Sequence, residues 1–233
     1  MTAAGNVQSE GRGALRFEDQ GANNVCCMNG PGVPWIVTEG AATVWVNGQP
    51  AAGLSHATTH SGGKGALSQA GKTVLLGGPS ITMEEMARAD ALAMIDKAML
   101  SLDRWNADDR AHFKEWFGTD SEEARNKMRE RLRRIRKKLQ EEDLVVGNDP
   151  GKYAHVWPFG NTVNLDDCFW TAPRTGKDSR AGTLVHETSH FWGAAGTRDY
   201  AYGRTKCRRL ASEHPDKALG NADSYEYWLE TLP

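Results

Sequence analysis

The most restrictive feature of this sequence is the pentapeptide His-Glu-Thr-Ser-His, which runs from His186 to His190. Residues four apart share one face of an α-helix, so a helical segment lets both imidazoles reach one metal ion. Glu187 is rotated away from that direction, yet it can reach a water beside the ion and take its proton. The segment predicts a helix over about residues 180–193. Apolar neighbours predict that this helix is buried: Leu184, Val185 and Phe191.

A functional site needs a third ligand, because the pentapeptide also arises by chance in ordinary structural helices. Gly193 and Gly196 allow the helix to end and the chain to turn back, and Asp199 follows nine residues after His190. Two imidazoles and one carboxylate leave a fourth position open for water, which is typical of catalytic rather than structural zinc sites. We therefore predict a Zn²⁺ site formed by the two histidines and Asp199, with Glu187 as the general base.

The residues that follow the pentapeptide resemble a known family. Residues 196–203 read Gly-Thr-Arg-Asp-Tyr-Ala-Tyr-Gly, which is similar to the G-T-x-D-x-x-Y-G signature of the aspzincins, the deuterolysin and peptidyl-Lys metalloendopeptidase family. The resemblance implies that Asp199 is the third zinc ligand and that Tyr202 hydrogen bonds the oxyanion of the tetrahedral intermediate. Three further segments in the family's order extend the resemblance over about residues 83–233: 116–118, 168–173 and 221–228.

An acidic pair near the C-terminus carries a finer expectation. Asp223 and Glu226 are three residues apart and share a face if residues 222–229 are helical. Two carboxylates beside a pocket favour a cationic side chain. The resemblance to the lysine-specific branch of the family implies that the pair lies in the S1′ pocket and that cleavage occurs before lysine. The alternative is a surface helix with two solvated acids.

The distribution of glycine divides the chain. Fifteen of the 25 glycines fall within residues 1–80, between short β-branched runs without a helical period. This pattern predicts a small β domain with many turns. A weak repeat of about 30 residues supports it, since the strand-and-turn pattern of residues 43–48 returns at residues 73–78.

The pattern becomes helical at Thr82. Thr82 and Glu85 form a capping box before a helix over residues 83–102, and a second helix is expected from about residue 120 to 141. Residues 143–175 look irregular or short-stranded. The expected fold class is therefore α+β, with a Gly-rich, cone-like β domain over residues 1–82 and a mainly helical zincin-type domain over residues 83–233.

Residues 39–80 resemble a second family, the PAAR-repeat proteins. Residues 43–52 and 56–60, together with the repeat at 73–78, carry this resemblance, although Gly53 stands where that family has arginine. Proteins of this kind form a pointed β cone that caps the spike of bacterial type VI secretion systems and carries fused toxins. The resemblance implies delivery into a target cell by a contractile secretion system, with the valine-glycine-repeat spike trimer and an immunity protein as partners.

Other histidines and cysteines give no unique ligand set. Four donors in the N-terminal part could hold a zinc of the PAAR type or serve as turn residues and core thiols: Cys26, Cys27, His56 and His60. Cys168 and Cys207 could form a disulfide or remain buried thiols. Three histidines lack ligand spacing and are expected in surface or hydrogen-bonding roles: His112, His155 and His214.

Composition and charge limit the class of partner. The formal net charge is −2 and no apolar run approaches the ~20 residues that span a bilayer, so we expect neither nucleic acid nor membrane as a partner. The first 20 residues show no secretory signal, which fits the expected route of delivery, since a protease carried on a spike would need none. The predicted function is a zinc endopeptidase effector acting on proteins or peptides. Two alternatives are a structural spike cap with a non-catalytic module and a zinc hydrolase of peptidoglycan peptides.

Overall fold

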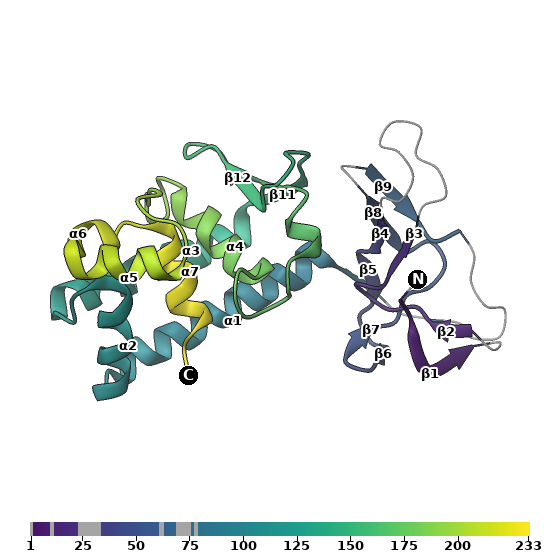
Figure 1. Cartoon of the computed structure of the whole chain (residues 1–233), viewed down its shortest axis with the longest axis horizontal. Helices are drawn as coiled ribbons and strands as arrows, with labels where there is room; N and C mark the ends of the chain where they lie inside the picture. Colours follow the sequence, from purple (N-terminus) through teal and green to yellow (C-terminus); the bar gives the residue numbers. More distant parts are fainter. Residues whose placement is uncertain (1, 10–11, 23–33, 61–62, 69–75, 77–78) are drawn as a thin grey trace. The chain divides into compact units, whose positions relative to one another are not determined.

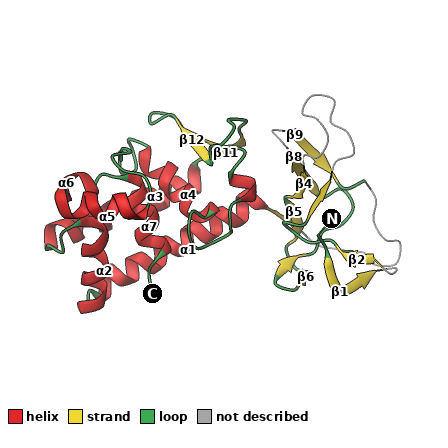
Figure 2. Cartoon of the chain, in the orientation of Figure 1, coloured by secondary structure: helices red, strands yellow, loops and turns green. Residues whose placement is uncertain are grey.

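The computed structural model describes residues 2–9, 12–22, 34–60, 63–68, 76 and 79–233 (Figure 1). The chain divides into two compact units, Met1–Met86 and Ala87–Pro233. Strands make up most of the regular structure of the first unit, and helices dominate the second (Figure 2). The prediction of a chain that mixes helices and strands is confirmed.

Short antiparallel pairings build the first unit. A four-stranded sheet has the order β3 (Gln20–Ala22), β4 (Pro34–Val37), β8 (Ala57–His60), β9 (Gly63–Ala66). Three two-stranded ribbons accompany it: β1 (Ala4–Ser9) with β2 (Arg12–Ala14), β5 (Glu39–Ala41) with β10 (Ser80–Thr82), and β6 (Trp45–Val46) with β7 (Gln49–Pro50). Asn47 and Gly48, which join the last pair, both have positive φ, which agrees with the turn predicted at these residues.

Several expectations for this unit lie outside the described residues. Cys26 and Cys27 belong to the segment 23–33, and the second copy of the repeat lies almost wholly in residues 69–75 and 77–78. The side chain of His60 is likewise not described. His56 is described, and its Nδ1 accepts a hydrogen bond from the backbone N–H of Gly53 at 3.1 Å.

Seven α-helices appear in the described part of the chain. They are α1 (Met83–Arg104), α2 (Ala107–Phe117), α3 (Glu122–Glu141), α4 (Arg180–His190), α5 (Arg204–Glu213), α6 (Pro215–Ala218) and α7 (Ala222–Glu230). The predicted capping box of α1 is present, since Thr82 N–H donates to Glu85 and Glu85 N–H donates to Thr82 Oγ1. The buried stripe of α3 is also as predicted: Ala124, Met128, Leu132, Ile135 and Leu139. None of the described helices has the length and apolar character to cross a membrane.

The expected helix over residues 180–193 is shorter in the structure, because α4 stops at His190 and Phe191 leaves the helical conformation. Helices α2, α5 and α6 were not predicted. The segment expected to be short-stranded forms a small mixed sheet of order β11 (Asp143–Val146), β13 (Thr162–Leu165), β12 (Ala154–Val156). β11 runs parallel to β13 and β12 runs antiparallel to it, so β12 lies at an edge.

Large side chains fill the core of the second unit. The rings of Phe113 and Phe117 each lie 5.5 Å from that of Trp228, in edge-to-face arrangements. All three side chains are fully buried. This aromatic cluster fixes α7 against α2, and α7 in turn packs along α4.

Candidate active site

Helix α4 is buried along almost its whole length. Ser179 caps it by accepting a hydrogen bond from Gly182 N–H at 3.0 Å, and residues Arg180–Ser189 are all buried. A Cβ atom on Gly182 would lie only 2.4 Å from Glu230 Oε1 and 3.0 Å from Glu226 Cγ. Glycine at this position therefore lets α4 approach α7 closely, which brings the first histidine of the pentapeptide beside the carboxylates of α7.

The chain returns to α4 through a loop that is held at several points. Gly196 adopts φ +60°, and Thr197 N–H then donates to the carbonyl of Ser189 at 3.1 Å. The side-chain oxygen of Asn221 accepts hydrogen bonds from Tyr200 N–H at 2.8 Å and Ala201 N–H at 2.9 Å. These bonds fix the backbone on both sides of residue 199.

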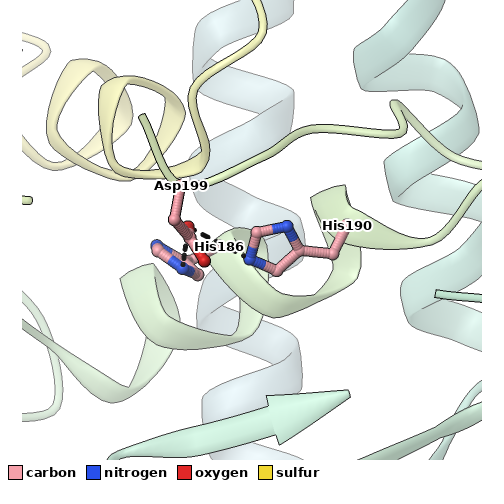
Figure 3. A group of neighbouring side chains, drawn as sticks. All are labelled: His186, His190 and Asp199. Carbon is pink, nitrogen blue, oxygen red and sulfur yellow. Dashed lines mark ion pairs between the residues drawn. The ribbon is translucent and has the colours of Figure 1, made fainter. Parts of the chain in front are cut away.

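The three predicted ligands meet in front of α4. Oδ1 of Asp199 lies 3.3 Å from Nε2 of His186 and 3.3 Å from Nε2 of His190 (Figure 3). One ligand atom from each residue falls within 4.8 Å of the others. Two imidazole nitrogens and one carboxylate oxygen form a donor set that Zn²⁺ accepts, with room for a fourth ligand.

The ring orientation of both histidines is set by their other nitrogen. Nδ1 of His186 lies 2.9 Å from Asp223 Oδ1 and 3.2 Å from Glu226 Oε2. Nδ1 of His190 lies 3.1 Å from the carbonyl oxygen of Thr197. Carboxylate or carbonyl partners of this kind hold a metal-binding imidazole with Nε2 toward the ion.

The charge distribution of the site suits a divalent cation. Burial works to lower the pKa of His186, but the surrounding carboxylates outweigh it and raise that pKa above its ordinary value. Burial works to raise the pKa of Asp199, but hydrogen bonds to the two histidines outweigh it and hold the pKa below its ordinary range. Four carboxylates surround two imidazoles here, so added positive charge would be stabilised. They belong to Glu187, Asp199, Asp223 and Glu226.

Glu187 lies next to the ligand set without joining it. Its Oε1 is 4.0 Å from His186 Nε2, and the residue is 8% exposed. Burial raises the pKa of Glu187 to about 7. A carboxylate with a pKa near neutrality is suited to accept and return a proton.

Tyr202 lies on the open side of the site. Its ring stacks over that of His186, with 6.5 Å between centroids and 17° between planes, and the residue is 59% exposed. Burial of its hydroxyl and the adjacent carboxylate of Asp199 raise the pKa of Tyr202 to about 12. The phenol therefore keeps its proton at neutral pH and can donate a hydrogen bond.

All these groups line one pocket of about 610 Å³. Strand β12, which packs against α4, also lines this pocket. Asp223 and Glu226 also line it, but they are only 5% and 7% exposed. The alternative of two solvated acids on a surface helix is thus wrong. Their contact with His186 is a role that the sequence did not predict, and substrate binding by the pair stays a prediction.

Among the described residues, the histidine and cysteine positions of the second unit are ordinary with one exception, and the disulfide alternative for Cys168 and Cys207 is not formed. His112 Nε2 lies 3.1 Å from the carbonyl oxygen of Trp228, while Cys168 and Cys207 are unpaired. The exception is His155, which borders the pocket and is hydrogen bonded to a buried carboxylate. Strand pairing brings His155 into the site, and no spacing in the sequence signalled it.

Comparisons with known proteins cover the second unit. The aspzincin (M35) family model, described as lysine-specific metallo-endopeptidase, matches residues 104–230. An extracellular protease of Aeromonas hydrophila is 38% identical over 158 residues, which are 63% of this chain and 45% of that protein. A peptidyl-Lys metalloendopeptidase of Grifola frondosa is 55% identical over 85 residues, 36% of this chain and 24% of that protein.

A solved zinc peptidase from Grifola frondosa has the same fold, with a TM-score of 0.58 and 34% identity, over 62% of this chain and 90% of that structure. The chain spans less than half the length of the two curated relatives described above. The family model nevertheless matches more than half of the present chain, and the zinc-type donor set lies within the matched residues. The chain belongs to the aspzincin (M35) family of zinc metallo-endopeptidases.

Proposed function

We propose that this chain hydrolyses internal peptide bonds as a zinc-dependent endopeptidase. The observation that carries the proposal is the convergence of His186, His190 and Asp199 on one point of the pocket, with Glu187 beside them. The donor types, the buried base and the membership of a metallo-endopeptidase family agree with this chemistry.

In the proposed mechanism, Zn²⁺ supplies a Lewis acid that polarises the scissile carbonyl and acidifies water. Glu187 takes a proton from the attacking water and returns it to the leaving amine. Tyr202 donates its hydroxyl hydrogen to the carbonyl oxygen as negative charge develops there. Asp223 and Glu226 hold the ring of His186, and the carbonyl of Thr197 holds that of His190.

We also propose that cleavage occurs on the N-terminal side of lysine. The description of the family and the name of the Grifola frondosa relative support lysine as the recognised residue, and the side of cleavage rests on the sequence resemblance. Asp223 and Glu226 supply two carboxylates at the border of the pocket, and an ammonium group would neutralise them.

Digestion of a denatured protein by the zinc-loaded chain tests both proposals. We expect cuts before lysine that a chelator abolishes, and a loss of kcat of about 1,000-fold in Glu187→Gln, since a general base contributes about 10²–10⁴. Zinc content equal to that of the parent is the control for this variant. Absence of cleavage by the zinc-loaded parent would refute the peptidase and favour a structural module. Cuts at other residues would refute the lysine specificity, and cleavage of peptidoglycan peptides alone would identify a different hydrolase.

For residues 1–82 we propose a PAAR-like tip that carries the peptidase on a type VI secretion spike, with an immunity protein in the producing cell. The proposal rests on the sequence resemblance of residues 39–80 and on the glycine-rich, short-stranded character of the unit. Co-purification of the full chain with the cognate valine-glycine-repeat trimer tests it. A chain that fails to bind the trimer would remove the delivery proposal and leave the peptidase proposal intact.

A further inference from the structure

Strand β12 contributes a third histidine, His155, to the lining of the pocket. Strand β12 forms an edge of its sheet and packs against α4, and its three residues all line the pocket together with Glu187. His155 is the middle residue of this strand and pairs with Asn164 of β13. The backbone of His155 is therefore fixed by the sheet.

The ring of His155 is held by a buried carboxylate. Its Nδ1 lies 2.6 Å from Oδ2 of Asp166, which is fully buried. The other oxygen of Asp166 accepts a hydrogen bond from Asp149 N–H at 3.0 Å, and Asp166 N–H donates to the carbonyl of Tyr153 at 2.9 Å. The carboxylate is thus anchored at both oxygens, and the imidazole has one preferred orientation.

The remaining ring nitrogen of His155, Nε2, is the one available to a ligand of the pocket. Both polar contacts of the ring, to Asp166 and to Asp149 at 3.8 Å, use Nδ1. None of the hydrogen bonds or ion pairs found among the described residues uses Nε2. The side chain is 38% exposed and lines the pocket together with Glu187.

A histidine held in this way is a good donor to developing negative charge. In the doubly protonated ring, Nδ1–H is donated to the carboxylate of Asp166 and Nε2 presents a second N–H to whatever occupies the pocket. Donors that are already aimed at the position of an oxyanion contribute strongly to acyl-transfer catalysis because they need no reorganisation.

We propose that His155 is a further catalytic residue, whose Nε2 donates a hydrogen bond to the carbonyl oxygen of the peptide bond under attack, and that Asp166 is its positioning residue. This inference rests on the proposed peptidase function. A competing use of the same side chains is a second cation site, since Asp149, His155 and Asp166 also have ligand atoms within 4.8 Å of one another. The 2.6 Å spacing of Nδ1 and Oδ2 is a hydrogen-bond distance, and Asp149 is already paired with Lys152 at 2.8 Å, so the structure favours the donor role.

Kinetics of the full zinc-loaded chain on a lysine-containing peptide give the first test. We expect His155→Ala to lower kcat by about 100-fold with a change in KM below about 3-fold, because removal of one oxyanion donor costs about 10²–10³. His155→Gln, which keeps an N–H donor, should recover part of the loss. Asp166→Asn should lower kcat more than Asp149→Asn, because only Asp166 is within hydrogen-bonding distance of the ring. His214→Ala is the control for loss of a histidine outside the pocket, and unfolding midpoints exclude a folding defect.

A phosphinic peptide, whose tetrahedral anion imitates the intermediate, gives a readout that needs no turnover. We expect His155→Ala to weaken its binding to the zinc-loaded chain by at least about 10-fold, as measured by calorimetry. Unchanged kcat and unchanged affinity in His155→Ala would overturn the inference while the peptidase stands. Two zinc ions per parent chain and one in His155→Ala would overturn it in favour of a second cation site. An inactive parent whose phosphinic affinity still depends on His155 would refute the peptidase proposal but not this contact.

Discussion

The two units of the chain differ in what holds them together. Among the described residues, ten of the twelve largest fully buried side chains belong to the unit over residues 87–233, and only Phe17 and Met83 belong to the other. The first unit relies on strands of two to six residues joined by turns. The second unit has a continuous aromatic and aliphatic core, and this core carries the site. The ligands from α4 and the following loop, and the α7 carboxylates that contact His186, all belong to this packed unit.

The largest expected effect on stability comes from replacing one tryptophan of each unit by alanine. We expect Trp228→Ala to lower the free energy of unfolding by about 3–5 kcal/mol, because a fully buried ring would be lost from the contact with Phe113 and Phe117. Trp45→Ala, at a position that is 47% exposed in the first unit, should cost less than about 1 kcal/mol. Urea unfolding of both variants measures the difference. Equal losses would show that the two units do not differ in this way.

Metal removal should lower the stability of the second unit and leave that of the first unit unchanged. An ion bound with free metal at about 1,000 times Kd stabilises the folded state by about 4 kcal/mol. We expect a chelator to lower the transition of the second unit, followed by near-UV circular dichroism of its tryptophans, and to leave the transition of residues 1–86 unchanged. Asp199→Ala should remove the response to chelator. If both transitions shift together, the two units unfold as one.

A pH-dependent test concerns Glu142, which is buried beside α4 and accepts hydrogen bonds from Thr188 Oγ1 at 3.0 Å. Burial raises the pKa of Glu142 to about 7 from the ordinary 4.5. Between these values the folded state keeps a proton that the unfolded state has lost. The contribution of the protonated Glu142 to the free energy of unfolding is therefore complete below pH 4.5 and is lost as the pH rises through 7.

In the chelated protein we expect Glu142→Gln to match the parent at pH 4.5 and to exceed its unfolding free energy at pH 8 by at most about 3.5 kcal/mol, at about 1.4 kcal/mol per pKa unit. The neighbouring Glu141→Gln, on an exposed side chain, should change neither value. Urea midpoints at the two pH values provide the measurement. A Glu142→Gln protein no more stable than the parent at pH 8 would contradict the expectation.

The smallest effect concerns the contact of α4 with α7. Gly182→Ala should cost about 1–3 kcal/mol, because the added Cβ would lie 2.4 Å from Glu230 Oε1. Gly193→Ala is the matched control, since a Cβ there meets no atom within 4 Å. Thermal unfolding compares the two. A Gly182→Ala protein as stable as the parent would show that the contact between α4 and α7 can adjust to an added methyl group.

Sequence reasoning was most successful for long helices, whose apolar residues repeat with a helical period over many turns. The stripe through Leu132 and Ile135 predicted α3, and the capping box of Thr82 predicted the start of α1. Helix α5 was missed because only Cys207 and Ala211 of its ten residues are buried, which leaves no apolar period to detect. Helix α2 carried a signal that was overlooked, the capping box of Asn106 with Asp109.

The site was predictable where its residues are close in sequence and not where sheet pairing assembles it. The two histidines and Asp199 lie within fourteen residues, so spacing and signature were sufficient to predict that they meet. His155 and Asp166 meet only because β12 pairs with β13, and those strands are three and four residues long. Strands this short leave almost no pattern in a sequence.

The double use of the α7 carboxylates has an evolutionary consequence. Asp223 and Glu226 border the cavity and at the same time hydrogen bond the imidazole of His186. A lineage that replaced either acid to admit a different side chain would also loosen the ring that faces the ion. A change at either position would therefore act on the ion and on the cavity wall at once.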